Sequence, residues 1–416
     1  MLKVYADHSA TTPLSPAAWE AMQLCLQAEY ANASQPYSFS RTAKRTLRQA
    51  RETIAQCLNA QPEEIYFTSG GTESNNWVLK MSLLSSGYTP NHANTISKQP
   101  ARTVRETSAA NSHDAAAQTD CTPPSDPQLI TGAIEHHAVL NPCRWLEDLG
   151  FPIAYLPVDR QGLIGLPALK RLLQSDPGHP VRLVSVMAAN NEIGTIQPLA
   201  EISGMAHEYG ARVHSDAVPA VGHIPLDVQA LGLDYLSASA HKFNGPKGIG
   251  FLYQRRGREL SPLLHGGAQE NGRRAGTENT AAIAGMAAAL EENCRLMTER
   301  SGHLLRLEEI ILNKLKNSEV AFIRQGTDWL PGLLSLSFPG YSGEALLHRL
   351  DLQGISISTG SACDSQNTQI SHVLKAIHLS AAEAEGTVRI SLGHENSADE
   401  IKYLAEKLTQ AVSMQT

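Results

Sequence analysis

Short apolar runs alternate with segments of helical spacing between residues 64 and 255. Seven of these runs are rich in β-branched, aromatic or leucine residues and are typical of strands: 65–68, 129–133, 153–156, 183–187, 211–214, 233–236 and 250–253. Helical patterns follow some of the runs, as at 137–149 and 201–209. This alternation predicts an α/β fold with a mainly parallel sheet and helices on both of its faces.

A second pattern begins near residue 263. A glycine-rich stretch at 266–272 leads into a long alanine-rich helix, whose charge-free apolar part (279–290) is too short to span a bilayer. Two strand patterns (333–338 and 387–392) and a final helix (398–412) follow. We therefore expect a large domain over 15–262 and a smaller α+β domain over 1–14 and 263–416.

One segment, 85–126, lacks both patterns. It is rich in Ser, Thr, Asn, Gln, Ala and Pro and has almost no aromatic residues. Such a composition cannot bury enough apolar surface to order itself, so it predicts a disordered insertion or a long surface loop. A docking role is the alternative.

The composition of the 416 residues is that of an ordinary globular protein, with 42% hydrophobic and 18% charged residues. A net charge of −7 argues against non-specific nucleic-acid binding. The first residues hold no apolar signal core, and no stretch predicts a membrane span. The six cysteines are scattered without metal-like spacing, which favours a reduced, cytoplasmic protein.

Lys242 is the first candidate for chemistry. It follows a predicted strand, is flanked by Ser239 and His241, and precedes a glycine-rich turn. A lysine can hold an aldehyde cofactor as a Schiff base. A lysine alone after a strand is usually a surface residue, so the other requirements of pyridoxal phosphate must be found as well.

Those requirements appear in chain order upstream of the lysine. Gly71 and Thr72 stand where a strand leads into a helix, the place that binds phosphate. Asp216 follows a strand and is suited to keep a pyridine nitrogen protonated; as an alternative it caps a helix. His136 is suited to stack on the ring and to move protons, and Asn191 to bond the ring hydroxyl. Each residue alone has a structural explanation, but all follow strands of one sheet.

These motifs resemble the cysteine desulfurases of the class-V aminotransferase superfamily, enzymes that depend on pyridoxal phosphate and have fold type I. The resemblance covers nearly the whole chain except the 85–126 segment, and its matching stretches are 5–13, 68–75, 135–139, 190–194, 239–250, 273–279, 361–363 and 371–374. It implies a seven-stranded sheet in the large domain and L-cysteine as the substrate.

The resemblance also implies roles for residues that their patterns leave open. It implies a homodimer in which Thr277 reaches the cofactor phosphate of the partner subunit. It implies that Arg389, which alternates with apolar residues in 387–392 and so points away from the core, binds the substrate carboxylate. It implies that Cys363, in a small and polar stretch typical of a mobile loop, is the nucleophile.

In the implied reaction, cysteine displaces Lys242 from the cofactor. Lys242 then moves the α-proton with help from His136, and Cys363 attacks the substrate sulfur. Alanine and a Cys363 persulfide result. A protein acceptor takes the sulfur, for iron–sulfur cluster assembly, tRNA thiolation or another pathway.

The chain departs from the family pattern at several positions. Pro219 stands where the family has a glutamine that contacts the ring hydroxyl, Ala268 replaces a glycine, and Gln366 and Ile370 replace Gly and Pro in the cysteine loop. An active, divergent desulfurase is the favoured interpretation. The alternatives are a cofactor-binding paralogue with weak or no turnover that acts as an interaction protein, and a selenocysteine lyase or transaminase of the same fold.

Overall fold

The computed structural model describes residues 2–28, 30–85, 127–174, 180–318, 320–359 and 370–413. The predicted insertion after Ser85, with Cys121, lies outside the described residues, and so does the stretch that carries Cys363. Within the described part of the chain, no helix is long and apolar enough to cross a membrane.

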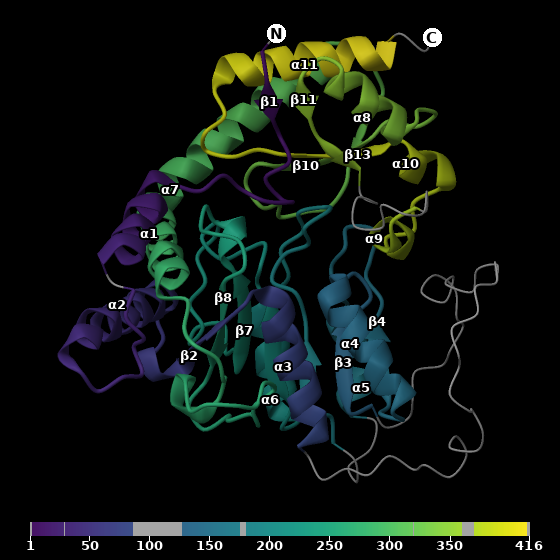
Figure 1. Cartoon of the computed structure of the whole chain (residues 1–416). Coiled ribbons are helices and arrows are strands. Elements are labelled where there is room, and N and C mark those ends of the chain that lie inside the picture. Colours follow the sequence, from purple (N-terminus) through teal and green to yellow (C-terminus); the bar gives the residue numbers. More distant parts are fainter. Residues whose placement is uncertain are drawn as a thin grey trace, which may run out of the picture.

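The largest sheet has seven strands in the spatial order β2, β8, β7, β6, β5, β3, β4 (Figure 1). Their bounds are β2 Ile65–Thr68, β3 Leu129–Gly132, β4 Ile153–Leu156, β5 Leu183–Ser185, β6 Arg212–Asp216, β7 Tyr235–Ser239 and β8 Gly250–Gln254. The five strands from β7 to β4 are parallel to one another, whereas β8 is antiparallel to both of its neighbours, β2 and β7. The predicted mainly parallel α/β sheet is therefore confirmed, and each of the seven predicted runs forms one strand.

Alternate residues of this large sheet enter two different cores. Phe67 packs on the face covered by α2, α5, α6 and the first part of α7, whereas its neighbour Tyr66 packs on the face covered by α3 and α4. The period of two along a strand requires this division, since successive side chains point to opposite faces. The helices are α2 Arg41–Leu58, α3 Gly71–Leu84, α4 His137–Asp148, α5 Leu166–Leu173, α6 Leu199–Glu208 and α7 Thr280–Lys316.

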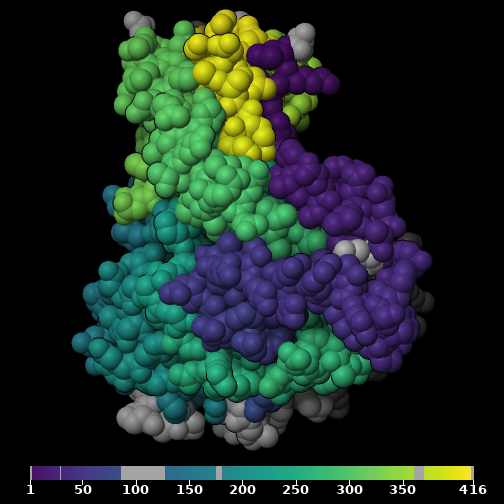
Figure 2. Space-filling view, turned by 90° about the vertical axis from the view of Figure 1, so that its left-hand side faces the viewer, coloured from purple at the N-terminus to yellow at the C-terminus, as the bar shows by residue number. Residues whose placement is uncertain are grey.

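A smaller antiparallel sheet lies beyond the large one, in the order β12, β13, β10, β9 (Figure 1). It is covered by α8 and α11, and a separate parallel pair, β1 with β11, joins the chain start to this region. In the space-filling view, the chain start (purple) lies beside the C-terminal segment (yellow) at the top of the molecule (Figure 2). The bounds are β1 Val4–Tyr5, β9 Ile323–Arg324, β10 Leu333–Ser337, α8 Gly343–Asp351, β11 Ile355–Ser356, β12 Ser358–Thr359, α9 His372–Ala376, α10 Ala381–Glu385, β13 Thr387–Ser391 and α11 Ala398–Ser413.

Helix α7 joins the two regions. It has 37 residues, which corresponds to roughly 55 Å at 1.5 Å per residue. The Asn279 side chain caps it by accepting a hydrogen bond from the Ala282 N–H at 3.1 Å. Its first turns bury residues such as Leu290 in the large core, and Leu304 to Leu315 belong to the core under the small sheet. One rigid helix therefore fixes the position of one sheet relative to the other.

Candidate active site

The predicted cofactor residues of the large sheet lie at one of its edges. Parallel strands place their carboxyl ends at the same edge, and polar residues there form the ligand sites of such sheets. Asp216 ends β6 beside Ser237 of β7, and Ser239 ends β7. Gly71 and Thr72 open α3 directly after β2, while His136 and Asn191 follow β3 and β5.

Lys242 ends a single 3-10 turn, Ala240–Lys242, that follows β7. Its Nζ donates hydrogen bonds to the backbone carbonyls of Ser9 and of Ala10, the latter at 3.0 Å. The His223 Nε2–H donates to the Lys242 carbonyl at 2.7 Å. The lysine is thus held from two sides, by the chain start and by the segment after β6. A cavity of about 40 Å³ adjoins it.

His241 and its neighbours attach the chain start to the same turn. Its Nδ1 lies 3.2 Å from the Thr11 hydroxyl, and its carbonyl accepts the Thr12 N–H at 2.9 Å. Burial lowers the pKa of His241 to about 4, with Lys242 contributing in the same direction. His241 is therefore a neutral hydrogen-bonding group at pH 7.

Asp216 is buried beneath the lysine. Its carboxylate accepts the Asn75 side-chain N–H at 2.7 Å and the Val218 backbone N–H at 3.1 Å. Burial raises the pKa of Asp216, whereas His136 and Lys242 lower it by their electrostatic interaction with it. The three ionisable groups are therefore close enough to influence one another. A buried carboxylate in this position fits the pyridine nitrogen of pyridoxal phosphate.

The first turn of α3 fits the cofactor phosphate. A Cβ on Gly71 would come within 2.3 Å of the Val218 Cγ2, so this position admits no side chain. The Ser239 hydroxyl lies 3.3 Å from where a Cβ on Gly70 would be, which places it beside the helix start. The first N–H groups of a helix lack partners within the helix and attract anions. Gly71, Thr72 and Ser239 are the residues that would hold the phosphate.

An acidic residue in the same turn is neutralised by an arginine. Glu73 accepts the Ser69 N–H at 2.7 Å and two hydrogen bonds from Arg274, at 2.9 and 3.1 Å. Burial alone would raise the pKa of Glu73, but the hydrogen bonds from Arg274 and Ser69 lower it. The segment that carries Thr277 therefore lies against the helix start, with Thr277 itself exposed.

His136 uses one of its ring nitrogens as a helix cap. Its Nδ1 accepts the Ala138 N–H at 3.1 Å at the start of α4. Burial lowers the pKa of His136, and the positive charge of Lys242 lowers it further. The negative charge of Asp216 acts in the opposite direction but does not outweigh them. The neutral imidazole therefore carries its proton on Nε2, which leaves an N–H donor for the cofactor or the substrate.

Arg389 lies on β13 between the two sheets. As predicted, it points away from the core that its neighbours Val388 and Ile390 enter. The chain start and the loop after β5 contact it on that other side, and the arginine is only 5% exposed. Its Nη2 donates to Asp7 at 2.7 Å and its Nη1 to the Asn191 carbonyl at 3.2 Å, while its buried Nε has no hydrogen-bond partner among the residues that the structure describes. A buried guanidinium with an unused N–H is suited to bind a carboxylate.

Three of these hydrogen-bonded pairs were not predicted from the sequence. They are Asn75 with Asp216, Asp7 with Arg389, and Arg274 with Glu73. For Asn75 a signal existed, because it stands four residues after Gly71 and therefore on the same face of α3. The residues of the other two pairs are 382 and 201 positions apart in the sequence. No local pattern indicates such a pair.

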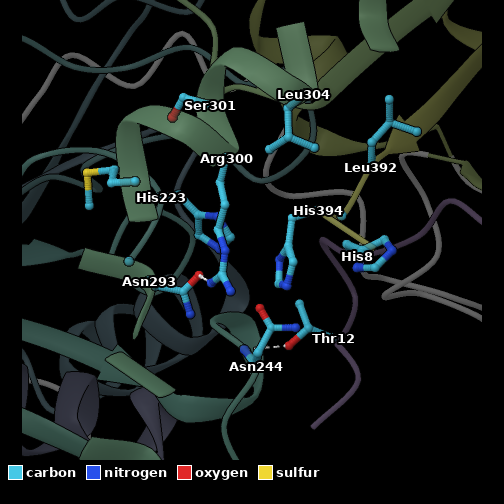
Figure 3. Close-up of a pocket in the computed structure, with 13 residues that line it drawn as sticks. His8, Thr12, His223, Asn244, Asn293, Arg300, Ser301, Leu304, Leu392 and His394 are labelled. Atoms are coloured by element: carbon cyan, nitrogen blue, oxygen red, sulfur yellow. Dashed lines mark hydrogen bonds between the residues drawn. The ribbon is translucent and has the colours of Figure 1, made fainter. Parts of the chain in front are cut away.

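A second cavity, of about 30 Å³, lies beside the site between the two sheets (Figure 3). His8, His223 and His394 line it together with Arg300, and their side chains point into the same space. Burial lowers the pKa of His8 to about 4, and burial with Arg300 and His8 lowers that of His394 to about 4. Burial also lowers the pKa of His223. The three histidines are therefore neutral at pH 7, beside the charged guanidinium of Arg300.

This cluster predicts a loss of stability in mild acid. A histidine with a depressed pKa binds fewer protons when folded than when unfolded between pH 6.5 and pH 4. The free energy of unfolding should thus be highest above pH 6.5 and should fall by about 1.4 kcal/mol per pH unit for each such imidazole below it. Urea unfolding at pH 7.0 and 5.0 measures this fall. In His394→Gln, the free energy of unfolding should fall less between pH 7.0 and pH 5.0 than it does in wild type. An equal fall in both proteins would show that His394 does not have a depressed pKa.

The comparisons with known proteins agree with this geometry. The sequence matches the family model of class-V aminotransferases over residues 4–97 and 104–404. It is 40% identical to the cysteine desulfurase IscS of Dictyoglomus turgidum over 412 residues, 99% of this chain and 94% of that protein. Among solved structures, a NifS-like protein superposes with a TM-score of 0.84 at 34% identity, covering 99% of this chain and 100% of the other.

A further solved structure, described as SspA in complex with cysteine, superposes with a TM-score of 0.75 at 32% identity and covers 95% of this chain and all of its own. The fold type predicted from the sequence is confirmed by these neighbours, and the family depends on pyridoxal phosphate. The buried Asp216, the bare helix start at Gly71 and the lysine between them fit that cofactor. The chain therefore belongs to the cysteine desulfurase family of the class-V aminotransferases.

Proposed function

We propose that the protein removes the sulfur of L-cysteine, releases L-alanine and holds the sulfur as a persulfide on Cys363. One observation carries the proposal: Lys242, Asp216 and His136 follow or end strands of one sheet at the same edge, and the buried Arg389 of the small sheet donates a hydrogen bond to the Asn191 carbonyl at that edge. Bound pyridoxal phosphate supplies the electron sink that makes the Cα proton of an amino acid acidic.

The protein groups divide the remaining work. Arg389 binds the α-carboxylate of the substrate. For this, the substrate carboxylate must replace the Asp7 carboxylate as a partner of the guanidinium. Asp216 keeps the ring nitrogen protonated, and the helix start at Gly71 and Thr72, with Ser239 and His241, holds the phosphate. The Lys242 amine would take the proton from Cα, and the His136 Nε2–H is the donor that would help its transfer. Asn191, whose carbonyl accepts a hydrogen bond from Arg389, would bind the ring hydroxyl and the substrate.

Cys363 completes the reaction. Its thiolate would attack the substrate sulfur, form the S–S bond of the persulfide and break the substrate Cβ–S bond. The electron pair of the broken bond stays with the carbon skeleton, which becomes alanine after protonation. It stands outside the described residues, so its role here rests on the sequence match at 361–363.

Product analysis tests the proposed activity. The purified enzyme with L-cysteine and a thiol reductant should yield alanine and sulfide in equal amounts. L-selenocysteine with the same enzyme tests the lyase alternative, and an α-keto acid with an amino donor tests the transaminase alternative. Cofactor binding without alanine formation would support the paralogue that acts only as an interaction protein.

Pro219 lines the cavity beside Lys242, at the position where related enzymes have a glutamine. Pro219→Gln is expected to restore a hydrogen-bond donor to the ring hydroxyl, which contributes about 0.5–1.5 kcal/mol and tightens cofactor binding up to roughly tenfold. Dialysis followed by absorbance of the retained cofactor measures this. Pro331→Gln, which changes another proline that lines the same cavity, is the matched control and should leave cofactor retention unchanged. Weaker retention in Pro219→Gln would show that another residue makes the contact.

We also propose a homodimer in which Thr277 completes the phosphate site of the partner subunit. Two features support it: the exposure of Thr277 beside the start of α3, and a group of exposed apolar side chains at α1 (Pro16–Ala28) and just after it. Those side chains are Trp19, Leu24, Leu26, Tyr30, Tyr37 and Phe39. Apolar patches of this kind mark protein interfaces.

The dimer is tested by mass in solution. Light scattering should give about twice the 44.9 kDa of one chain. Trp19→Asp with Leu26→Asp, seven residues apart on one helix face, should give monomers that lose cofactor more readily. Leu352→Asp, equally apolar and 75% exposed but on the small-sheet region, should leave the mass unchanged. If wild type has the mass of a monomer in solution, the proposed homodimer is wrong.

The division into domains, 15–262 against 1–14 with 263–416, also stays a proposal, supported by the separate cores under the two sheets. We place the reaction in the cytoplasm, because the four described cysteines form no disulfide with one another and a reducing compartment keeps cysteines as thiols. The sulfur then passes to an acceptor protein of iron–sulfur cluster assembly or of tRNA thiolation. Capture of proteins bound only to the persulfide form would distinguish the two.

A further inference from the structure

The backbone that carries Lys242 is held by distant parts of the chain. The carbonyls of His241, Lys242 and Phe243 each accept a hydrogen bond from outside their own turn. The His241 carbonyl accepts the Thr12 N–H at 2.9 Å and the Thr12 hydroxyl at 3.0 Å. The other two bonds come from side chains of the segment after β6 and of α7, and the proposed reaction does not use either side chain.

His223 holds the carbonyl of Lys242 itself. Its Nε2 lies 2.7 Å from that oxygen, and because a carbonyl only accepts, Nε2 carries the hydrogen. The preceding Gly222 brings this segment close to the turn. Its φ is +80°, and a Cβ on it would lie 2.9 Å from the Phe243 Cβ and 3.3 Å from the Asn293 Cβ. Glycine is therefore required there, and the imidazole beside it stays within reach of the lysine carbonyl.

Asn293, on α7, holds the next carbonyl. It is 2% exposed, and its Nδ2 donates to the Phe243 carbonyl at 2.8 Å and to the Ala289 carbonyl at 2.9 Å. Its Oδ1 accepts a hydrogen bond from the Arg300 Nη1 at 2.6 Å (Figure 3). A guanidinium only donates, so this contact determines which end of the amide faces the turn. Arg300 thus orients the Asn293 amide with its N–H groups toward the two carbonyls.

These bonds determine the direction of the lysine side chain. The peptide groups before and after the Lys242 Cα are planar, so their orientations define φ, ψ and the direction of the Cα–Cβ bond. The Thr12 bonds orient the first peptide group. The second is held on one side by the Phe243 N–H, which donates to the Ala240 carbonyl at 3.0 Å, and on the other side by His223. Without the imidazole, this peptide group keeps one bond and can rotate about it.

We propose that His223 and Asn293 are positioning residues for Lys242, which keep the lysine-bearing turn in the orientation from which the amine reaches both the cofactor aldehyde and the substrate Cα. The inference rests on the proposed role of Lys242. Because both side chains act through the backbone of the turn, their loss should slow the steps that the amine performs. Binding of the substrate carboxylate at Arg389 should not change.

The rate at which Lys242 forms its Schiff base measures this effect. Full-length protein stripped of cofactor is mixed with pyridoxal phosphate and followed by absorbance, and borohydride reduction with peptide mass spectrometry then locates the bond. His223→Phe removes the donor, and Asn293→Asp places a carboxylate oxygen against the Phe243 carbonyl. Each variant should slow bond formation and lower kcat about 10- to 100-fold, while KM for L-cysteine stays within about threefold of the wild-type value.

Two further variants separate positioning from a general loss of structure. His223→Gln supplies an N–H again, so the rate should recover to within about threefold of wild type. His303→Phe removes another imidazole that donates to a backbone carbonyl, that of Asn396 at 2.9 Å, from a part of α7 away from the turn. Although the lost hydrogen bond is of the same kind, this variant should form the Schiff base at the wild-type rate.

Three results would overturn the proposal. They are a wild-type rate in His223→Phe or in Asn293→Asp, a rate in His223→Gln as slow as in His223→Phe, and an equal slowing in His303→Phe. A failure of the proposed function is seen separately, in wild type alone. Cofactor fixed to another lysine would refute the proposed role of Lys242. Cofactor fixed to Lys242 without alanine formation would refute the desulfurase activity, and the Schiff base rates would still test the positioning.

Discussion

Lys242→Ala is expected to abolish turnover of L-cysteine and all covalent attachment of pyridoxal phosphate. The loss should be on the order of 10³-fold or more, because the same amine both holds the cofactor and moves the Cα proton. Borohydride reduction followed by peptide mass spectrometry detects a cofactor fixed to lysine. The variant should show none, although the phosphate site at Gly71 and the carboxylate of Asp216 still bind the cofactor without a covalent bond.

Lys247→Ala is the matched control. It lies five residues further along the same segment and is exposed. This variant should keep both the reducible bond and the activity. If reduction of Lys242→Ala still fixed the cofactor to a lysine, and sulfide were still released, the assignment of Lys242 would be wrong.

Cys363→Ser is expected to separate binding from sulfur transfer. The cofactor should remain bound, and added cysteine should still shift its absorbance, because Lys242, Asp216 and Arg389 are unchanged. Alanine and sulfide release should fall to the background rate, since a hydroxyl at this position cannot form a persulfide. Sulfide assays and cofactor spectra on one sample measure both properties.

Cys143→Ser provides the comparison among the other cysteines. Burial raises the pKa of the Cys143 thiol, so it is a poor nucleophile and its loss should leave the rate of sulfide release unchanged. Sulfide release by Cys363→Ser at the wild-type rate would remove Cys363 from the mechanism while leaving the cofactor site intact.

The large sheet was predictable from the sequence because its strands are buried on both faces. Runs such as Ile65–Thr68 and Ile153–Leu156 consist of β-branched, aromatic and aliphatic residues and are followed by turn residues, so their bounds were predicted to the residue. The two-residue strands β1 and β11 were not predicted. Their pairing, Val4 with Ile355, joins distant segments and leaves no local pattern.

Helix α7 was predicted only in part. Its apolar beginning is evident as an alanine-rich stretch, but the helix continues to Lys316 through a charged region. Leu304, Leu307, Ile311 and Leu315 recur there at helical spacing and face the core under the small sheet. That spacing is a signal for a second buried stripe, so this extension was open to prediction.

The candidate site was predictable as a set of residues but not as a set of contacts. Asp216, His136 and Lys242 follow strands of one sheet, so the topology alone places them together. The partners that set their chemistry come from elsewhere: Asp7 on Arg389 and the Ser9 and Ala10 carbonyls on Lys242 belong to the chain start. The protonation of His136 depends on burial, which only the folded structure defines.

The most direct measurement of the central claim is the mass of the Cys363 peptide after one turnover. Wild-type enzyme is mixed with L-cysteine without a reductant, alkylated and digested. The proposed function predicts one additional sulfur atom on the peptide that contains Cys363, with alanine formed in equal amount. Alanine formed with the extra sulfur on another cysteine, or with no protein-bound sulfur at all, would contradict it.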